Sequence, residues 1–169
     1  YSSNVALARE KTLNASADQD IFDSTPFKGE LKYKKLLWID SDISWLPEDV
    51  ISLYESDKDV ITGAYMLGNG TAVAYKELLS EPFTFQEVLE MKELVQIASA
   101  GFGFICFKQG VFESLSRPWF QQVVVSLKKE NGETHPFVIM GEDIALCKRV
   151  TDAGFEIWLD PAVKVTHNK

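Results

Sequence analysis

Asp40 and Asp42, two carboxylates one residue apart, directly follow a short apolar run at residues 36–39. A continuous apolar run of this kind is typical of a central strand that is covered on both faces. Side chains at i and i+2 of a strand point the same way, which predicts two carboxylates on one side, about 7 Å apart at the backbone. Like charges at this spacing repel unless a cation lies between them, and hard divalent cations bind carboxylate oxygens. The pair therefore indicates a metal site at a strand end; a polar turn that caps the next helix is the alternative.

A second acidic pair, Glu142 and Asp143, opens the segment EDIALCKRVTDAG. Apolar residues form one stripe along this segment and Gly154 follows it, so we predict a helix. A carboxylate at a helix start is stabilised by the helix dipole and is placed to accept a proton from a hydroxyl group. Ordinary capping of the helix N-terminus is the alternative.

Two further features fit the hypothesis of a metal and ligand site near these carboxylates. His167 ends the predicted strand VKVTH, and imidazole is a common ligand for Mn²⁺-like cations; a surface histidine without a ligand is the alternative. Gly101, Phe102 and Gly103 separate two predicted strands, where glycine often marks the close approach of a ligand or of another backbone. A bulge without a ligand explains these glycines equally well.

The elements that must position these residues alternate along the chain. We predict helices within residues 2–16, 46–56, 84–91 and 142–154, and strands ending near Asp40 and within residues 58–67, 72–75, 94–108, 155–161 and 163–167. This alternation favours an α/β fold with a mixed sheet. Residues 117–140 are predicted to be irregular, with Trp119 and Phe120 in an exposed loop that either stacks on an acceptor sugar or packs back.

The bulk composition limits the classes of function. The chain has 169 residues, enough for one domain with a proper core. A net charge of −8 argues against nucleic acid as the main partner, because such binding needs many Lys and Arg contacts to phosphates. The apolar runs are shorter than the about 20 residues of a membrane span. Cys106 and Cys147 lack metal or redox spacing and are predicted to be core residues.

The order of three segments resembles the GT-A class of nucleotide-sugar glycosyltransferases, of the family-2 type. These segments are LLWIDSDI, AGFGFICFKQGVFESL and GEDIALCKRVTDAGFEIWLDPAVKVTH, and the upstream NVALAREKTLNAS is similar to the family's ALAR helix. The resemblance extends from about Asn4 to His167 and is specific for the class rather than for the sugar. It implies one GT-A, Rossmann-like domain over residues 1–169, with a mixed, mostly parallel central sheet flanked by helices.

The resemblance also implies residue roles. Asp40, Ser41 and Asp42 match the D-x-D motif, in which Asp42 binds Mn²⁺ or Mg²⁺ and Asp40 holds the donor ribose or the metal through water. The implied metal ligands are Asp40, Asp42 and His167. The implied residues for the nucleotide-diphosphate sugar donor are Arg9, Asp40, Ser41, Asp42, Gly101, Phe102 and Gly103. Asp143 matches the general base of inverting members, with Glu142 as the fallback, acting on a glycan or another hydroxyl acceptor.

The beginning of the chain departs from the family's pattern. Members normally start with a strand, a helix and a strand that hold the nucleotide base, whereas this chain opens at the ALAR helix. We therefore expect that roughly 30–50 residues, the length of one such unit, are absent or replaced by another segment.

Two other readings explain the acidic strand end. LLWIDSDIS also resembles the haloacid-dehalogenase phosphohydrolases, in which Asp40 would be a nucleophile and Asp42 an acid. Ile43 and Ser44 depart from that motif, which usually lies near the chain start. The third reading is a non-catalytic module that binds a sugar or a nucleotide.

Overall fold

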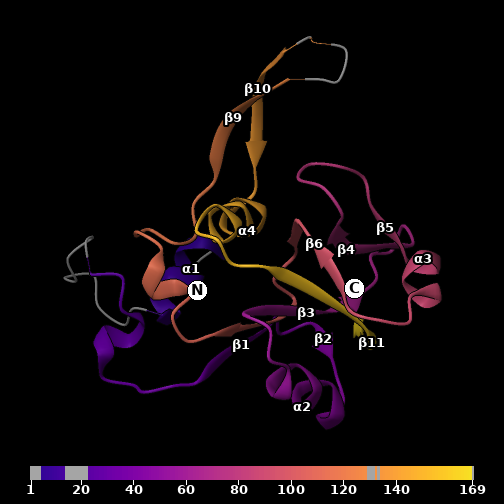
Figure 1. Ribbon diagram of the computed structural model, residues 1–169, viewed down its shortest axis with the longest axis horizontal. Coiled ribbons are helices and arrows are strands. Elements are labelled where there is room, and N and C mark those ends of the chain that lie inside the picture. Colours follow the sequence, from indigo (N-terminus) through magenta and orange to yellow (C-terminus); the bar gives the residue numbers. More distant parts are fainter. Residues whose placement is uncertain (1–4, 14–22, 129–131, 133, 169) are drawn as a thin grey trace.

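The computed structural model describes residues 5–13, 23–128, 132 and 134–168, without the side chains of residues 127, 128, 135 and 136. Its centre is one β-sheet, which is seen nearly edge-on between the helices in Figure 1. The order across this sheet is β1 (Lys35–Ile39), β8 (Phe104–Lys108), β3 (Val60–Tyr65), β11 (Ile157–His167) and β2 (Ile43–Ser44), with β6 (Val95–Ile97) also paired to β11.

The prediction of an α/β fold with a mixed sheet is confirmed, but the prediction that the sheet is mostly parallel is wrong. Among the described strands of this sheet, only β3 and β11 pair in parallel, whereas β8 runs antiparallel to both β1 and β3. The reason lies in the connections. A parallel neighbour needs a long crossover, usually a helix. The chain instead reaches β8 from β6 and β7 (Ser99–Ala100) through the short glycine-containing turn at residues 101–103.

All four predicted helices are present. They are α1 (Val5–Leu13), α2 (Pro47–Glu55), α3 (Phe85–Glu90) and α4 (Glu142–Asp152), with short 3₁₀ turns η1 (Pro26–Gly29) and η2 (Phe112–Ser114). The capping box of α3 is confirmed, because Thr84 Oγ1 accepts from the Glu87 N–H at 3.2 Å and Glu87 Oε2 accepts from the Thr84 N–H at 2.7 Å. Gly154, with φ +91°, follows α4.

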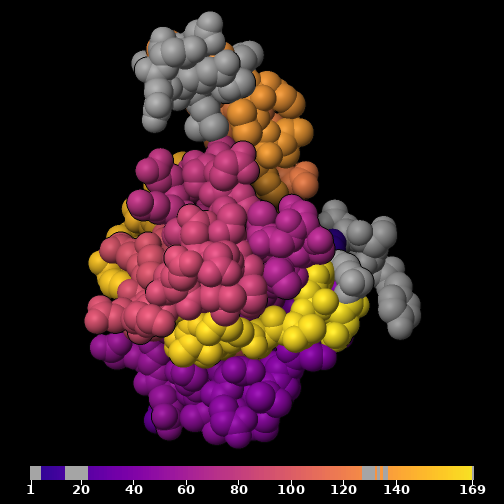
Figure 2. Space-filling model, turned by 90° about the vertical axis from the view of Figure 1, so that its right-hand side faces the viewer, coloured from indigo at the N-terminus to yellow at the C-terminus, as the bar shows by residue number. Residues whose placement is uncertain are grey.

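Helices cover both faces of the central sheet. Alternate residues of β8 belong to two different apolar clusters: Phe104 lies in the cluster that contains Leu53 of α2, and Ile105 lies in the cluster that contains Leu146 of α4. This alternation is what a strand buried on both faces requires. In the turned view, the yellow C-terminal segment runs as a band between the purple part of the chain below and the pink part above (Figure 2).

The predicted irregular stretch contains two strands. β9 (Val123–Lys128) and β10 (Thr134–Met140) form an antiparallel hairpin that stands out from the body (Figure 1). The sequence signal was present, since apolar residues with high strand propensity lie on both sides of an Asn-Gly dipeptide.

Two further predictions on side-chain burial have clear outcomes. Trp119 and Phe120 are 0% and 4% exposed, so the predicted exposure of this loop is wrong and its aromatics pack back into the core. Cys106 and Cys147 are buried, which confirms them as core cysteines. A small sheet of β4 (Thr71–Tyr75), β5 (Pro82–Thr84) and β7 completes the structure.

Candidate functional site

The acid pair lies in a turn rather than in a strand. β1 ends at Ile39, and the chain then turns, so that the Ile43 N–H donates to the Asp40 carbonyl at 3.1 Å. The i, i+2 geometry of a strand therefore does not apply to Asp40 and Asp42, and that part of the prediction is wrong. The two carboxylates have different partners.

His167 is the partner of Asp42. Its Nε2 lies 3.3 Å from Asp42 Oδ2, which confirms the predicted proximity of this histidine to the acid pair. Backbone pairing produces the contact: β11 runs antiparallel to β2, with His167 opposite Ile43. The Asn168 N–H also donates to the Asp42 carbonyl at 2.8 Å. Side chains 125 positions apart are thereby held together by the sheet.

Arg9 is the partner of Asp40. Its Nη2 lies 3.4 Å from Asp40 Oδ1, and its Nη1 lies 3.1 Å from Glu142 Oε1. The guanidinium lies over the Phe102 ring, 5.1 Å from the centroid, and Arg9 is only 7% exposed. One buried cation therefore joins the start of α4, the end of β1 and the middle of α1.

Asp143 lies beside this ion-pair network. Burial raises the pKa of its carboxyl above the ordinary value, and the charge of Glu142 raises the pKa further. The Ile144 N–H, which donates to Oδ1 at 2.8 Å, and the Arg9 charge act in the opposite direction. A carboxylate whose pKa is raised toward neutrality is better suited to accept a proton.

Tyr65 explains the glycines at 101 and 103. Its hydroxyl oxygen accepts from the Gly103 N–H at 3.2 Å. A Cβ at Gly101 would lie 2.4 Å from that oxygen and 2.5 Å from Val73 Cγ1, and a Cβ at Gly103 would lie 2.7 Å from Tyr65 Cζ. The close approach that the glycines permit is therefore to a protein side chain, and a role of the 101–103 segment in donor binding stays a prediction.

Tyr65 is also a site residue that no sequence pattern indicated. It ends the strand VITGAY and reads as a core position. Its ring nevertheless lies 5.8 Å from the ring of His167. Burial raises the pKa of its hydroxyl, as do the nearby charges of Asp40 and Asp143, so the group stays protonated.

Asp42 and His167 are the described residues that best fit a divalent cation. Over the described part of the chain, no three His, Cys, Asp or Glu side chains gather closely enough to hold a metal ion alone. Asp42 and His167 form a two-ligand set of oxygen and imidazole nitrogen, which suits Mn²⁺ better than Mg²⁺ because Mg²⁺ prefers oxygen ligands; phosphate oxygens and water would supply the remaining ligands. Asp40, which contacts Arg9, is a less direct candidate, and its role as a metal ligand stays a prediction.

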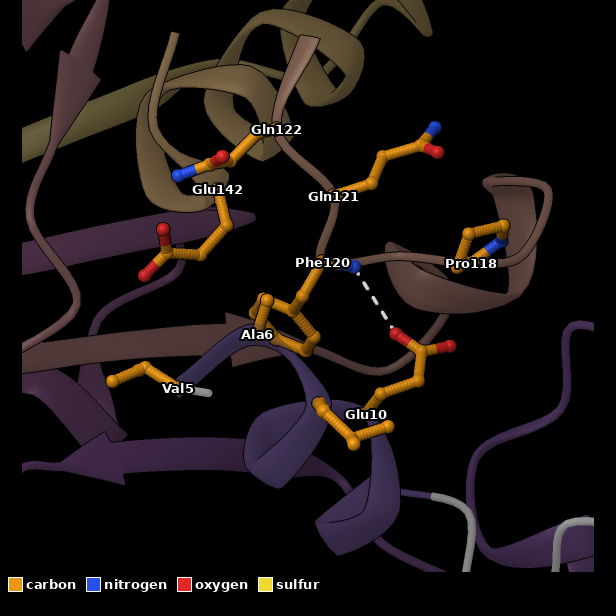
Figure 3. A pocket seen from close by; sticks show the side chains of 9 residues that line it. Val5, Ala6, Glu10, Pro118, Phe120, Gln121, Gln122 and Glu142 are labelled. Carbon is orange, nitrogen blue, oxygen red and sulfur yellow. Dashed lines mark hydrogen bonds between the residues drawn. The ribbon is translucent and has the colours of Figure 1, made fainter. Parts of the chain in front are cut away.

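Two pockets border the Arg9 ion pairs. Glu142 lines the first, together with α1 and residues 118–122 (Figure 3). Asp40 and Ser41 line the second, which follows α1 and β1 and has a volume of about 650 Å³. Arg9, Asp40, Ser41 and Glu142 line one or the other of these two pockets, whereas Asp42, His167 and Asp143 line neither of them.

Comparison with known proteins adds a fold relationship. No family model and no curated protein sequence matches the chain. The crystal structure of A197 from STIV is similar, with a TM-score of 0.57 and 17% sequence identity, over 94% of this chain and 64% of that chain. At this identity the similarity shows a shared fold, and this chain spans 64% of the length of that protein.

None of the helices in the described ranges is both long enough and apolar enough to cross a membrane.

Proposed function

We propose that the protein is a metal-dependent glycosyltransferase with a single GT-A, Rossmann-like domain. It moves a sugar from a nucleotide-diphosphate donor to the hydroxyl group of a glycan or another acceptor. The observation that carries the proposal is the contact between Asp42 and His167 at 3.3 Å, made by two residues whose shared role was inferred from the resemblance.

The charge balance of the site supports a cation. Asp40, Glu142 and Asp143 bring three carboxylates toward one buried guanidinium, that of Arg9, and a fourth carboxylate, that of Asp42, lies beside His167. An excess of carboxylates raises the local concentration of cations. A divalent metal at Asp42 and His167 would stabilise, as a Lewis acid, the negative charge that develops on a departing diphosphate.

Asp143 is the general base that activates the acceptor. Its carboxylate takes the proton of the acceptor hydroxyl as that oxygen attacks the sugar carbon, and the stereochemistry at that carbon inverts. Its raised pKa makes it a better base than an exposed aspartate. Arg9 contacts both Glu142 and Asp40 and so holds these two carboxylates in fixed positions.

Asp42→Ala tests the metal site. We expect the variant to lose the Mn²⁺-dependent binding of a nucleoside diphosphate, measured by calorimetric titration, while circular dichroism shows an unchanged fold. Asp57→Ala is the matched control, because the Asp57 side chain is 91% exposed and lies outside the site. An unchanged Mn²⁺-dependent titration in Asp42→Ala would contradict the proposal.

A product assay separates the rival activities. A glycosyltransferase releases nucleoside diphosphate from a sugar donor, whereas a phosphohydrolase that uses Asp40 as nucleophile releases inorganic phosphate from a simple ester. Donor binding without release of either product would instead support the non-catalytic module.

A further inference from the structure

The pocket beside Glu142 has a composition that selects one kind of ligand. It encloses about 620 Å³ between the start of α1, the loop at residues 118–122 and the start of α4 (Figure 3). Apolar side chains, two glutamines and two glutamates line it. A volume of this size accommodates a small organic ligand.

The charged groups of this pocket already have partners. Glu10 accepts from the Trp119 and Phe120 N–H groups at 3.0 and 3.1 Å, and its Oε1 lies 3.4 Å from Arg117 Nε. In Figure 3 a dashed line joins the Phe120 nitrogen to the Glu10 carboxylate, whose Oε2 accepts this hydrogen bond. Glu142 pairs with Arg9 at 3.1 Å. An anionic ligand would meet these two carboxylates, and the described residues that line the pocket include no cation to offset its charge.

The available hydrogen-bonding groups are neutral amides. Gln121 and Gln122 are exposed, and the described residues give their side-chain amides no hydrogen-bond partner. Each amide supplies two donor hydrogens and an acceptor oxygen. The Gln122 amide lies on the Glu142 side of the pocket, and the Gln121 side chain extends in a different direction (Figure 3). Hydroxyl groups, which both donate and accept, match such amides.

The remaining wall is apolar. Phe120 and Pro118 line it from the loop, and Val5, which is 52% exposed, lines it from α1. A ligand that presents hydroxyl groups on its edge and C–H groups on its face fits this combination of apolar wall and amide rim. A neutral sugar ring has this chemistry.

We propose that this pocket binds a neutral sugar unit of the acceptor. The inference rests on the proposed function, because Glu142 lines the pocket and its neighbour Asp143 is the proposed base. A sugar bound at the Glu142 end of the pocket therefore lies beside the start of α4, the helix that carries Asp143. Gln121 and Gln122 act as specificity-determining residues.

The test measures sugar binding separately from donor binding. Saturation-transfer NMR with millimolar neutral methyl glycosides should show contacts with the wild-type protein, and methyl glucuronide should show none. The double variant Gln121→Ala/Gln122→Ala should bind the best glycoside about tenfold more weakly, through the loss of two hydrogen bonds. Gln109→Ala, which changes an exposed glutamine outside the pocket, should bind it normally. Neither change should alter the Mn²⁺-dependent titration of nucleoside diphosphate.

The outcomes separate the two proposals. If no neutral glycoside binds, if methyl glucuronide binds equally well, or if the double variant binds normally, the sugar pocket is overturned even where the nucleotide titration succeeds. If glycosides bind through the two glutamines while the nucleotide titration fails, the pocket stands as a sugar-binding site and the transferase function falls.

Discussion

Arg9 shows how one side chain organises the site. Its guanidinium is buried against Phe102 and contacts both Asp40 and Glu142, which come from distant parts of the chain. A buried guanidinium is stable only when it is paired, so the two carboxylates hold Arg9 as much as Arg9 holds them. The sequence placed Arg9 near the nucleotide by resemblance alone, whereas its two carboxylate partners appear only in the structure.

Asp143→Asn separates catalysis from stability. Because burial raises the pKa of Asp143 in the folded protein, protonation of this group stabilises the fold below its ordinary value of 3.8, and the contribution is lost as the pH rises through the raised pKa. Asparagine carries no charge, so we expect Asp143→Asn to be more stable than wild type at neutral pH, with a gain that disappears in acid.

Chemical denaturation at several pH values measures this gain, and a transfer assay should show lost turnover with retained donor binding. Asp57→Asn, an exposed change, should leave both unchanged. Full turnover in Asp143→Asn would place the base elsewhere.

Gly101→Ala tests the contact with Tyr65. The new methyl group would meet the Tyr65 hydroxyl oxygen at 2.4 Å and Val73 Cγ1 at 2.5 Å, so the variant should lose about 1–3 kcal/mol of unfolding free energy. Gly68→Ala is the control, because a Cβ there has nothing within 4 Å. Equal urea midpoints for the two variants would mean that the Tyr65 ring moves aside without a loss of unfolding free energy.

At the scale of elements, α1 is anchored by polar contacts as well as by apolar packing. Leu13 is buried, but Val5 and Leu7 are 52% and 45% exposed. Two adjacent residues, Arg9 and Glu10, connect the helix to α4 and to the loop that carries Trp119. The loop is thereby fixed against α1, which is why its aromatics are buried rather than exposed.

Glu10→Ala should release this loop. The change leaves the N–H groups of Trp119 and Phe120 and the guanidinium of Arg117 without their carboxylate, so we expect a loss of about 2–4 kcal/mol. Thermal unfolding followed by Trp fluorescence measures it, with the exposed Glu93→Ala as control. A loss no larger than that of the control would show that the loop holds its place by apolar packing alone.

At the scale of the whole molecule, metal binding should raise the free energy of unfolding and therefore the Tm. A ligand that binds only the folded state stabilises it by mass action, about 2.7 kcal/mol at a concentration one hundred times Kd. For a chain of this size that corresponds to a rise in Tm of roughly 5–10 °C. We expect this rise with Mn²⁺ and nucleoside diphosphate together, its reversal by a chelator, and its absence in Asp42→Ala. A rise of the same size in Asp42→Ala would place the metal elsewhere.

Local sequence was sufficient for the four helices and for most strands of the central sheet, but it did not predict the hairpin of β9 and β10. The capping box of α3, the proline at the start of α2 and the glycine after α4 depend on neighbours within a few positions, so short-range patterns predicted them. Long-range packing decided the rest. The antiparallel course of β8, the separate partners of Asp40 and Asp42, and the approach of Tyr65 to Gly101 join residues far apart in the chain. Such contacts depend on how the whole sheet assembles, and no short-range pattern records them.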